Sequence, residues 1–226
     1  MTALRLVIFD VDGTLVDSQA DIIAAMSEAF TRAGQTPPNR TAILGIVGLS
    51  LEVAIPKLAP GLDPALHTQM VQWYKDAYVA LRAKIGAAQS SPLYPHVRAT
   101  LNALHAQPET LLGVATGKSR RGLDKLLDGH DLGALFVTQQ VSDHHPSKPH
   151  PSMLHAALSE TGVEAQNAVM IGDTTFDMQM ARAAGIAFVG VAWGYHPPSA
   201  LGDAVAILED MRDLPGCLST HWGLAA

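Results

Sequence analysis

The stretch LRLVIFDVDGTLVDS, residues 4–18, decides the fold. Its apolar, partly β-branched run at residues 6–9 predicts a buried strand, and that strand ends at Asp10 and Asp12. Two carboxylates so close together at the end of a buried strand raise each other's pKa, so either a cation has to offset them or water has to solvate them well. A divalent cation that prefers oxygen ligands is the natural candidate. The stretch therefore predicts a strand with a charged site at its carboxyl end.

Composition narrows the classes of function. The chain has 226 residues, enough for one large domain or for one domain with a smaller one inserted. A net charge of -6 without a basic run argues against a nucleic-acid partner, but it leaves room for a small anionic substrate in a local cationic pocket. The single cysteine, Cys217, allows no internal disulfide, so we expect a cytoplasmic protein. The short N-terminal apolar run predicts neither a signal peptide nor a membrane span.

Two kinds of pattern follow the first strand. Residues 19–85 show helical patterns alone, whereas from residue 93 onward apolar strand patterns alternate with helical ones. Such alternation is typical of a parallel sheet covered by helices on both faces. We expect helices at 20–33, 41–47, 51–58, 64–84, 96–106, 119–127, 151–161 and 176–184, and further strands at 111–115, 135–138, 168–171, 186–191 and 204–208.

The predicted fold class is α/β, a Rossmann-like, doubly wound parallel sheet core with an inserted small α-helical cap domain. We place the core at residues 1–17 and 92–226 and the cap at residues 18–91. The chain would cross between the two near residues 17–18 and again near residues 90–95.

Three further groups of polar residues follow predicted strands or open predicted helices. Thr116 and the amide of Gly117 can donate hydrogen bonds to phosphate oxygens, close to the start of a helix. Lys148 lies in a proline-rich loop, where a fixed ammonium could balance carboxylates. Asp173 follows a strand as Asp10 does, and Asp177 lies one helical turn further on, so both carboxylates can face the same site.

In order and spacing, these groups resemble the four motifs of the haloacid dehalogenase superfamily of phosphohydrolases, over essentially the whole chain. The motifs are Asp-x-Asp-Gly-Thr at residues 10–14, Thr116, Lys148 and Gly-Asp-x-x-x-Asp at residues 172–177. The resemblance implies a two-step phosphoryl transfer. Asp10 would attack phosphorus and form an aspartyl-phosphate, and Asp12 would protonate the leaving oxygen and then activate water.

The resemblance also implies a cofactor and a set of ligands. Mg²⁺ would be held by the Asp10 carboxylate, the backbone carbonyl of Asp12 and Asp173, with Asp177 reaching the ion through water or orienting its shell. The phosphoryl oxygens would be bound by Thr116, Gly117 and Lys148.

The second acid, Asp12, and the cap narrow the class of reaction and of substrate. Dehalogenases of this superfamily lack an acid at the position of Asp12, so its presence favours a phosphatase or a phosphomutase. The cap and the loop Val47, Gly48 and Leu49 resemble those of phosphoglycolate phosphatases, which place such a loop over the leaving group. We therefore expect a Mg²⁺-dependent phosphatase, acting as a monomer or homodimer on a small phosphate monoester such as phosphoglycolate.

Several alternatives stay open at this point. A mutase of the β-phosphoglucomutase type would share all four motifs, and so would a phosphatase for sugar phosphates, nucleotides or pyrophosphate. A catalytically inactive scaffold on this fold is disfavoured by the intact acids. For Trp193 and Tyr195 we favour simple packing at a strand end, and we interpret the histidines around Lys148 as loop residues because no metal-ligand spacing is present.

Overall fold

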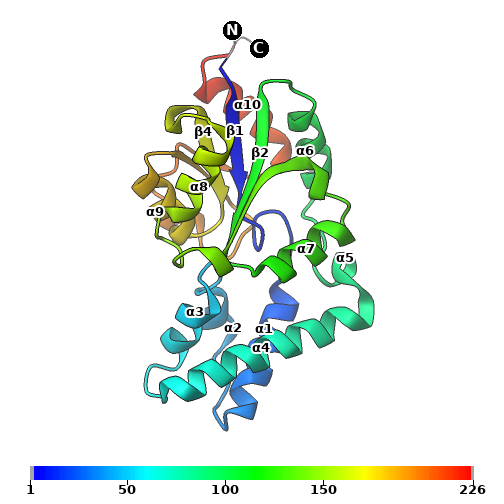
Figure 1. The fold of residues 1–226 in the computed structure, drawn as a ribbon, viewed down its shortest axis with the longest axis vertical. Helices are drawn as coiled ribbons and strands as arrows, with labels where there is room; N and C mark the ends of the chain where they lie inside the picture. Colours follow the sequence, from blue (N-terminus) through cyan, green and yellow to red (C-terminus); the bar gives the residue numbers. More distant parts are fainter. Residues whose placement is uncertain (1–2, 225–226) are drawn as a thin grey trace.

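The fold is seen in a computed structural model that describes residues 3–224, so the outermost residues of the predicted core, 1–2 and 225–226, lie outside it. A parallel sheet with strand order β3-β2-β1-β4-β5-β6 forms the centre (Figure 1). Its strands are β1 (Arg5–Phe9), β2 (Thr110–Thr116), β3 (Phe136–Val141), β4 (Ala168–Gly172), β5 (Ala187–Val191) and β6 (Ala206–Leu208).

Helices lie on both faces of the sheet and in a separate block. Between β1 and β2 come α1 (Gln19–Arg32), α2 (Arg40–Leu44), α3 (Leu51–Leu58), α4 (Pro64–Ile85), α5 (Ala87–Ser90) and α6 (Val97–His105). The later helices are α7 (Arg120–Gly129), α8 (Ser152–Thr161), α9 (Thr175–Ala184) and α10 (Leu214–His221). None of the helices within residues 3–224 combines the length and apolar character needed to cross a bilayer.

The sheet is buried on both faces because successive β1 side chains point to opposite sides. Leu6 and Ile8 join a core cluster with α8 and α9, whereas Val7 and Phe9 join a second cluster with α6, α7 and α10. These four side chains of β1 are fully buried. Burying one such side chain contributes roughly 1.5–3 kcal/mol, so this strand is anchored from both sides and holds its carboxyl end in place.

Helices α1–α5 form what we call the helical block, residues 19–90. Its core cluster combines apolar side chains of α1, α2, α3 and α4, including the fully buried Met26 and Met70. The long helix α4 begins where Asp63 accepts a hydrogen bond from the Ala65 amide at 2.7 Å, and it ends before Gly86. Figure 1 shows the block beyond the carboxyl ends of β1 and β2.

The chain enters and leaves the helical block along two adjacent segments. The Asp17 amide donates to the Pro92 carbonyl at 2.9 Å, and Val16 pairs with Leu93 in an antiparallel bridge. The predicted fold class is confirmed by the parallel sheet, and the predicted helices and strands all occur, with ends shifted by a few residues. Two helices were missed, α5 and α10. The division into core and cap stays a prediction.

Candidate functional site

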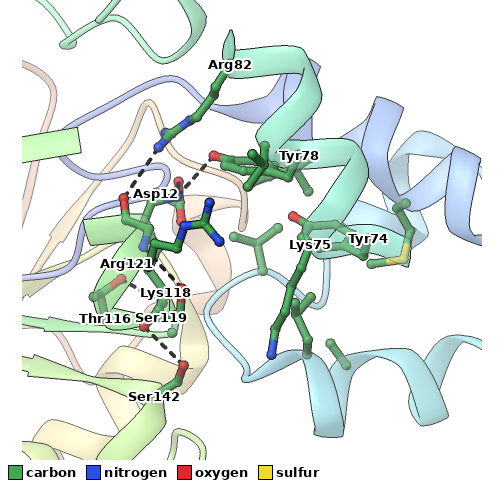
Figure 2. Close-up of a pocket in the computed structure, with 18 of the residues that line it drawn as sticks. Asp12, Tyr74, Lys75, Tyr78, Arg82, Thr116, Lys118, Ser119, Arg121 and Ser142 are labelled. Carbon is green, nitrogen blue, oxygen red and sulfur yellow. Dashed lines mark hydrogen bonds and ion pairs between the residues drawn. The ribbon is translucent and has the colours of Figure 1, made fainter. Parts of the chain in front are cut away.

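A cavity of about 580 Å³ lies between the carboxyl edge of the sheet and the helical block (Figure 2). The sheet side contributes residues that follow β1 and β2, and the block contributes side chains of α1, α3 and α4 and the 46–49 loop. In parallel α/β sheets ligands bind at this edge. The sequence-predicted residues that line the cavity are Asp10, Asp12, Val47, Gly48, Leu49, Thr116 and Gly117.

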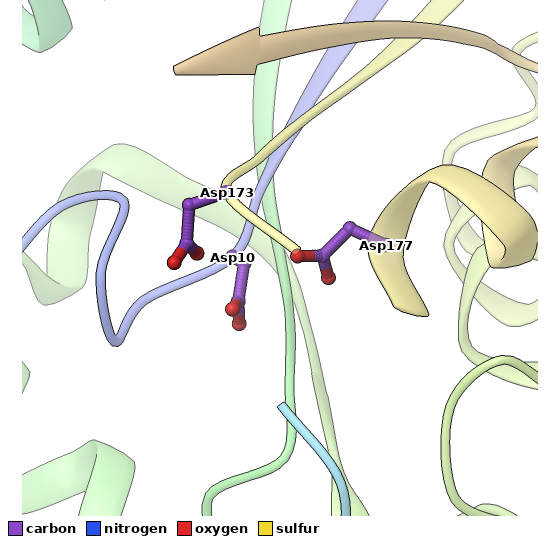
Figure 3. A group of neighbouring side chains, drawn as sticks. All are labelled: Asp10, Asp173 and Asp177. Atoms are coloured by element: carbon purple, nitrogen blue, oxygen red, sulfur yellow. The ribbon is translucent and has the colours of Figure 1, made fainter. Parts of the chain in front are cut away.

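Three buried carboxylates meet beside the cavity (Figure 3): Asp10, Asp173 and Asp177. One oxygen of each lies within 4.8 Å of the others. Sheet register explains the meeting, because the Asp10 amide donates to the Ile171 carbonyl at 2.9 Å and so continues the β1–β4 ladder beside Asp173. The capping box of α9 turns Asp177 inward, since its carboxylate accepts bonds from the Thr174 amide and hydroxyl.

Burial and mutual repulsion raise the pKa values of the clustered carboxylates, and a bound cation would counter both effects. Burial, opposed by Lys148 and reinforced by Asp177, raises the pKa of Asp10 to about 7. Burial together with repulsion from Asp177 and Asp10 raises the pKa of Asp173 well above its usual range. Asp10 Oδ2 is buried without a hydrogen-bond partner among the described residues. These oxygen donors suit a hard divalent cation, so the triad could hold a metal.

Lys148 supplies the only ammonium that the structure places against these acids within residues 3–224. Its Nζ lies 2.9 Å from Asp10 Oδ1 and 2.7 Å from Asp177 Oδ1, and the side chain is buried. Burial alone would lower the pKa of Lys148, but the two carboxylates outweigh it and hold that pKa above its usual value. One positive charge against three acids leaves the cluster negative when all are ionised, which again favours a cation.

Asp12 faces away from the triad and toward a different set of partners. Its Oδ1 accepts a hydrogen bond from the Ser18 hydroxyl and lies 2.8 Å from Lys118 Nζ. Lys118 is nearly buried, and its Nζ also donates to the Tyr78 hydroxyl of α4 at 3.1 Å. The Asp12 side chain thus lines the cavity with one oxygen bound by Ser18 and Lys118, and the predicted role of its backbone carbonyl as a metal ligand stays a prediction.

Sequence reasoning missed several residues that hold this site together. Lys118 received no role, although it lies two residues after the end of β2 at Thr116. The packing interpretation is incomplete for Tyr195. Its side chain packs against the core cluster of the helical block, but its amide also donates to Asp173 at 2.8 Å and its hydroxyl accepts from the Ser18 amide at 3.1 Å. Trp193 packs against Tyr94, yet its Nε1 also donates to the Thr14 carbonyl at 3.2 Å. The sequence signal that could have revealed these contacts is that Trp193 and Tyr195, which both carry hydrogen-bonding groups, follow the end of β5 closely.

The loop of Val47, Gly48 and Leu49 approaches the sheet edge at Gly117. A Cβ on Gly117 would lie 2.6 Å from the Gly48 carbonyl oxygen, closer than side chains tolerate. Gly48 itself has a φ of +100°, which favours glycine. Next to the loop, the Ser50 amide donates to the Ser147 hydroxyl at 2.9 Å, beside Lys148. The structure therefore brings the predicted cap loop and the predicted phosphate-binding residues together.

His145, near Lys148, joins its loop to β3 and α8. His145 Nδ1 lies 2.8 Å from the Ser152 hydroxyl and Nε2 lies 2.9 Å from Gln140 Oε1. Burial lowers the pKa of His145.

Comparison with known proteins decides the family. Residues 7–191 match the family model described as haloacid dehalogenase-like hydrolase. The chain belongs to this family. Among the relatives of this haloacid dehalogenase-like hydrolase is the phosphoglycolate phosphatase of Pseudomonas putida. The two sequences are 32% identical over 99% of this chain and 83% of the relative's length. The phosphoglycolate phosphatase of Pseudomonas fluorescens is 33% identical over 96% of this chain and 80% of its own length.

A solved structure agrees with these relatives. A protein described as a predicted phosphoglycolate phosphatase from Haemophilus somnus superposes with a TM-score of 0.82 at 27% identity, over 96% of this chain and 99% of its own. The predicted membership of the haloacid dehalogenase superfamily is confirmed, and with it the prediction of a phosphoric monoester hydrolase.

Proposed function

We propose that this haloacid dehalogenase-like hydrolase is a Mg²⁺-dependent phosphatase that hydrolyses a small phosphate monoester through an aspartyl-phosphate, with phosphoglycolate as the first candidate. The observation that carries the proposal is the unpartnered Asp10 Oδ2 beside the cavity, next to the ammonium of Lys148. The relatives named phosphoglycolate phosphatase support the substrate class. The helical block would act as the cap, with Val47, Gly48 and Leu49 over the leaving group.

The chain's own groups divide the reaction into two steps. In the first, an Asp10 oxygen attacks phosphorus, the bond to the ester oxygen breaks, and Asp12 gives that oxygen a proton. In the second, Asp12 takes a proton from water, which attacks phosphorus and releases Asp10. Lys148, the Thr116 hydroxyl and the Gly117 amide would stabilise the phosphoryl oxygens. Ser18 and Lys118 hold the Asp12 carboxylate through one oxygen, so the other can exchange protons.

The metal would be held by Asp10, the Asp12 carbonyl and Asp173, with Asp177 orienting the set. A bound Mg²⁺ would supply charge neutralisation at the phosphoryl oxygens and let three buried carboxylates ionise together. The donor set fits, because the triad consists of oxygen ligands within 4.8 Å of one another.

A panel of phosphate esters tests the proposed function. We expect the pure protein with Mg²⁺ to release phosphate from phosphoglycolate with a kcat/KM clearly above that for sugar phosphates, nucleotides and pyrophosphate. Comparable activity on many esters would support the phosphatase reaction but contradict phosphoglycolate as the specific substrate. Turnover that requires a phosphosugar activator would instead identify a mutase, and no hydrolysis of any ester would contradict the function altogether.

Metal removal gives a prediction with a definite pH dependence. The folded-state pKa of Asp10, about 7, lies above its ordinary value of 3.8. Without metal, the folded state therefore binds more protons between these values than the unfolded state does, and stability falls as pH rises through that window. Mg²⁺ must displace those protons. We expect excess chelator to stop activity reversibly, and Mg²⁺ to raise Tm more at pH 8 than at pH 5.5.

Thermal unfolding with Mg²⁺ or chelator at both pH values measures this effect. Asp173→Asn should lose most of the Mg²⁺-dependent gain, whereas the exposed Asp128→Asn should keep it. Equal Tm gains at the two pH values would show that the ion does not bind at the raised-pKa carboxylates.

A further inference from the structure

Cations gather around the cavity that lies beside the acid triad. The chain carries a net charge of -6, yet five of its basic side chains line this one cavity, where only Glu52 and Asp76 join the acids that follow β1. Lys75 is paired with Glu52 at 3.3 Å and Lys118 with Asp12 at 2.8 Å, and positive charge that such pairs leave unbalanced in the cavity favours a negatively charged leaving group. The five are Lys75 and Arg82 of α4, Lys118, and Arg121 and Lys125 of α7.

Arg82 is the most informative of these cations. Its side chain is only 7% exposed, and its Nε has no hydrogen-bond partner among the described residues. The remaining nitrogens donate to neutral oxygens, the Ser91 hydroxyl at 2.9 Å and the Gly122 carbonyl at 3.4 Å. The guanidinium lies 4.7 Å from the Tyr78 ring centre. No carboxylate within residues 3–224 forms an ion pair with it, so a buried guanidinium is left short of an anion.

The neighbouring charges do not remove that deficit. Asp21 influences Arg82 electrostatically, but its carboxylate accepts a hydrogen bond from the Ser90 hydroxyl and makes no ion pair with the guanidinium. Lys118 is engaged by Asp12 and Tyr78. Figure 2 shows Arg82 and Tyr78 reaching from α4 toward Lys118, with the Arg121 side chain beside them. The Arg121 side chain has no hydrogen-bond or ion-pair partner in the described part of the chain.

We propose that Arg82, aided by Lys118 and Arg121, forms a subsite for a second anionic group on the leaving group of the substrate. The protein would thus select phosphate monoesters that carry a carboxylate or a second phosphate close to the scissile bond. The guanidinium fork suits either anion, since both present paired oxygens. This inference rests on the proposed phosphatase function and assigns it a specificity-determining residue.

Three esters of the same two-carbon skeleton test the subsite. Phosphoglycolate carries a carboxylate, 1,2-ethanediol bisphosphate carries a second phosphate, and 2-hydroxyethyl phosphate is neutral at that position. We expect the wild-type protein to prefer the two anionic esters over the neutral one by about tenfold to a hundredfold in kcat/KM, the size of one charge-assisted hydrogen bond. The better of the two anionic esters identifies the anion.

Arg82→Gln should reduce this preference to near unity, and Arg82→Lys should retain part of it. The ratio of kcat/KM values is independent of the amount of folded enzyme, so a partly unfolded Arg82→Gln preparation still gives a valid reading. Lys84→Gln is the matched control, because Lys84 is an exposed cation on the same helix that does not line the cavity. Its ratio should match the wild type.

The outcomes separate the two proposals. If the wild-type protein hydrolyses none of the esters, the phosphatase function fails. If it hydrolyses 2-hydroxyethyl phosphate as well as the anionic esters, or if Arg82→Gln lowers all three equally, the function stands and the anion subsite is refuted.

Discussion

Asp10→Asn is expected to lower kcat by about 10³-fold or more while the protein stays folded. The amide keeps the shape of the side chain but lacks the charge and nucleophilicity of a carboxylate. Lys148 retains its ion pair with Asp177 at 2.7 Å in the variant, so its buried ammonium is not left unpaired. Phosphate release from phosphoglycolate under saturating Mg²⁺ measures the loss, and circular dichroism with thermal unfolding checks the fold.

Asp128→Asn is the control for this variant, because Asp128 is exposed and its side chain has no partner among the described residues. It removes the same charge at a residue that does not line the cavity, and it should leave kcat unchanged. Near-normal turnover by Asp10→Asn would exclude Asp10 as the nucleophile. Activity and circular dichroism have to be measured on the same preparation, because a variant that has unfolded loses activity whatever the role of Asp10.

Asp12→Asn is expected to lower kcat for phosphoglycolate by about 10²-fold to 10⁴-fold, and to change the kinetic pattern with p-nitrophenyl phosphate. Nitrophenolate leaves without a proton, so the first step loses little. The second step still lacks its base, so the phospho-enzyme accumulates. A stopped-flow trace should therefore show a burst of about one nitrophenolate per enzyme molecule, followed by slow turnover.

This pattern depends on the surroundings of Asp12. In the variant, the amide oxygen can still accept from Ser18 and Lys118, so the local geometry is kept. Equal losses with both esters and no burst would show that Asp12 acts on neither the leaving group nor water. Wild-type protein on the same two substrates provides the reference.

The fold was predictable where local pattern and burial agree. Residues 6–9 are apolar because β1 is covered on both faces, and Asp10 and Asp173 ended up together because β1 and β4 are hydrogen-bonded neighbours. Helix α10 is only eight residues long and contains Gly216, which weakens its helical pattern, although Pro215 in the first turn is compatible with a helix start. Its Leu214 and Leu218 are buried in the sheet's core cluster, so tertiary packing rather than propensity stabilises it.

The candidate site was predictable only in part for a related reason. Acids after strands are visible in the sequence, but the partners of Asp12 depend on distances across the fold. Tyr195 lies 177 residues from Ser18, and Lys118 is joined to Tyr78 of the helical block. Arg82 is an ordinary basic residue of an amphipathic helix in the sequence. In the fold its guanidinium is buried next to the cavity, where it donates to the Ser91 hydroxyl and to the Gly122 carbonyl of α7.

The chain enters and leaves the helical block through two segments that lie side by side, so the block can be replaced without moving the sheet. The Asp17 amide and the Pro92 carbonyl share one hydrogen bond, and Val16 and Leu93 are bridged like two strands of a hairpin. A short turn could close the chain there, and a different insert could be spliced in, without altering the order in which the sheet is threaded. Residues 19–90 can therefore be exchanged as a unit while the buried acids at the end of the sheet keep their places.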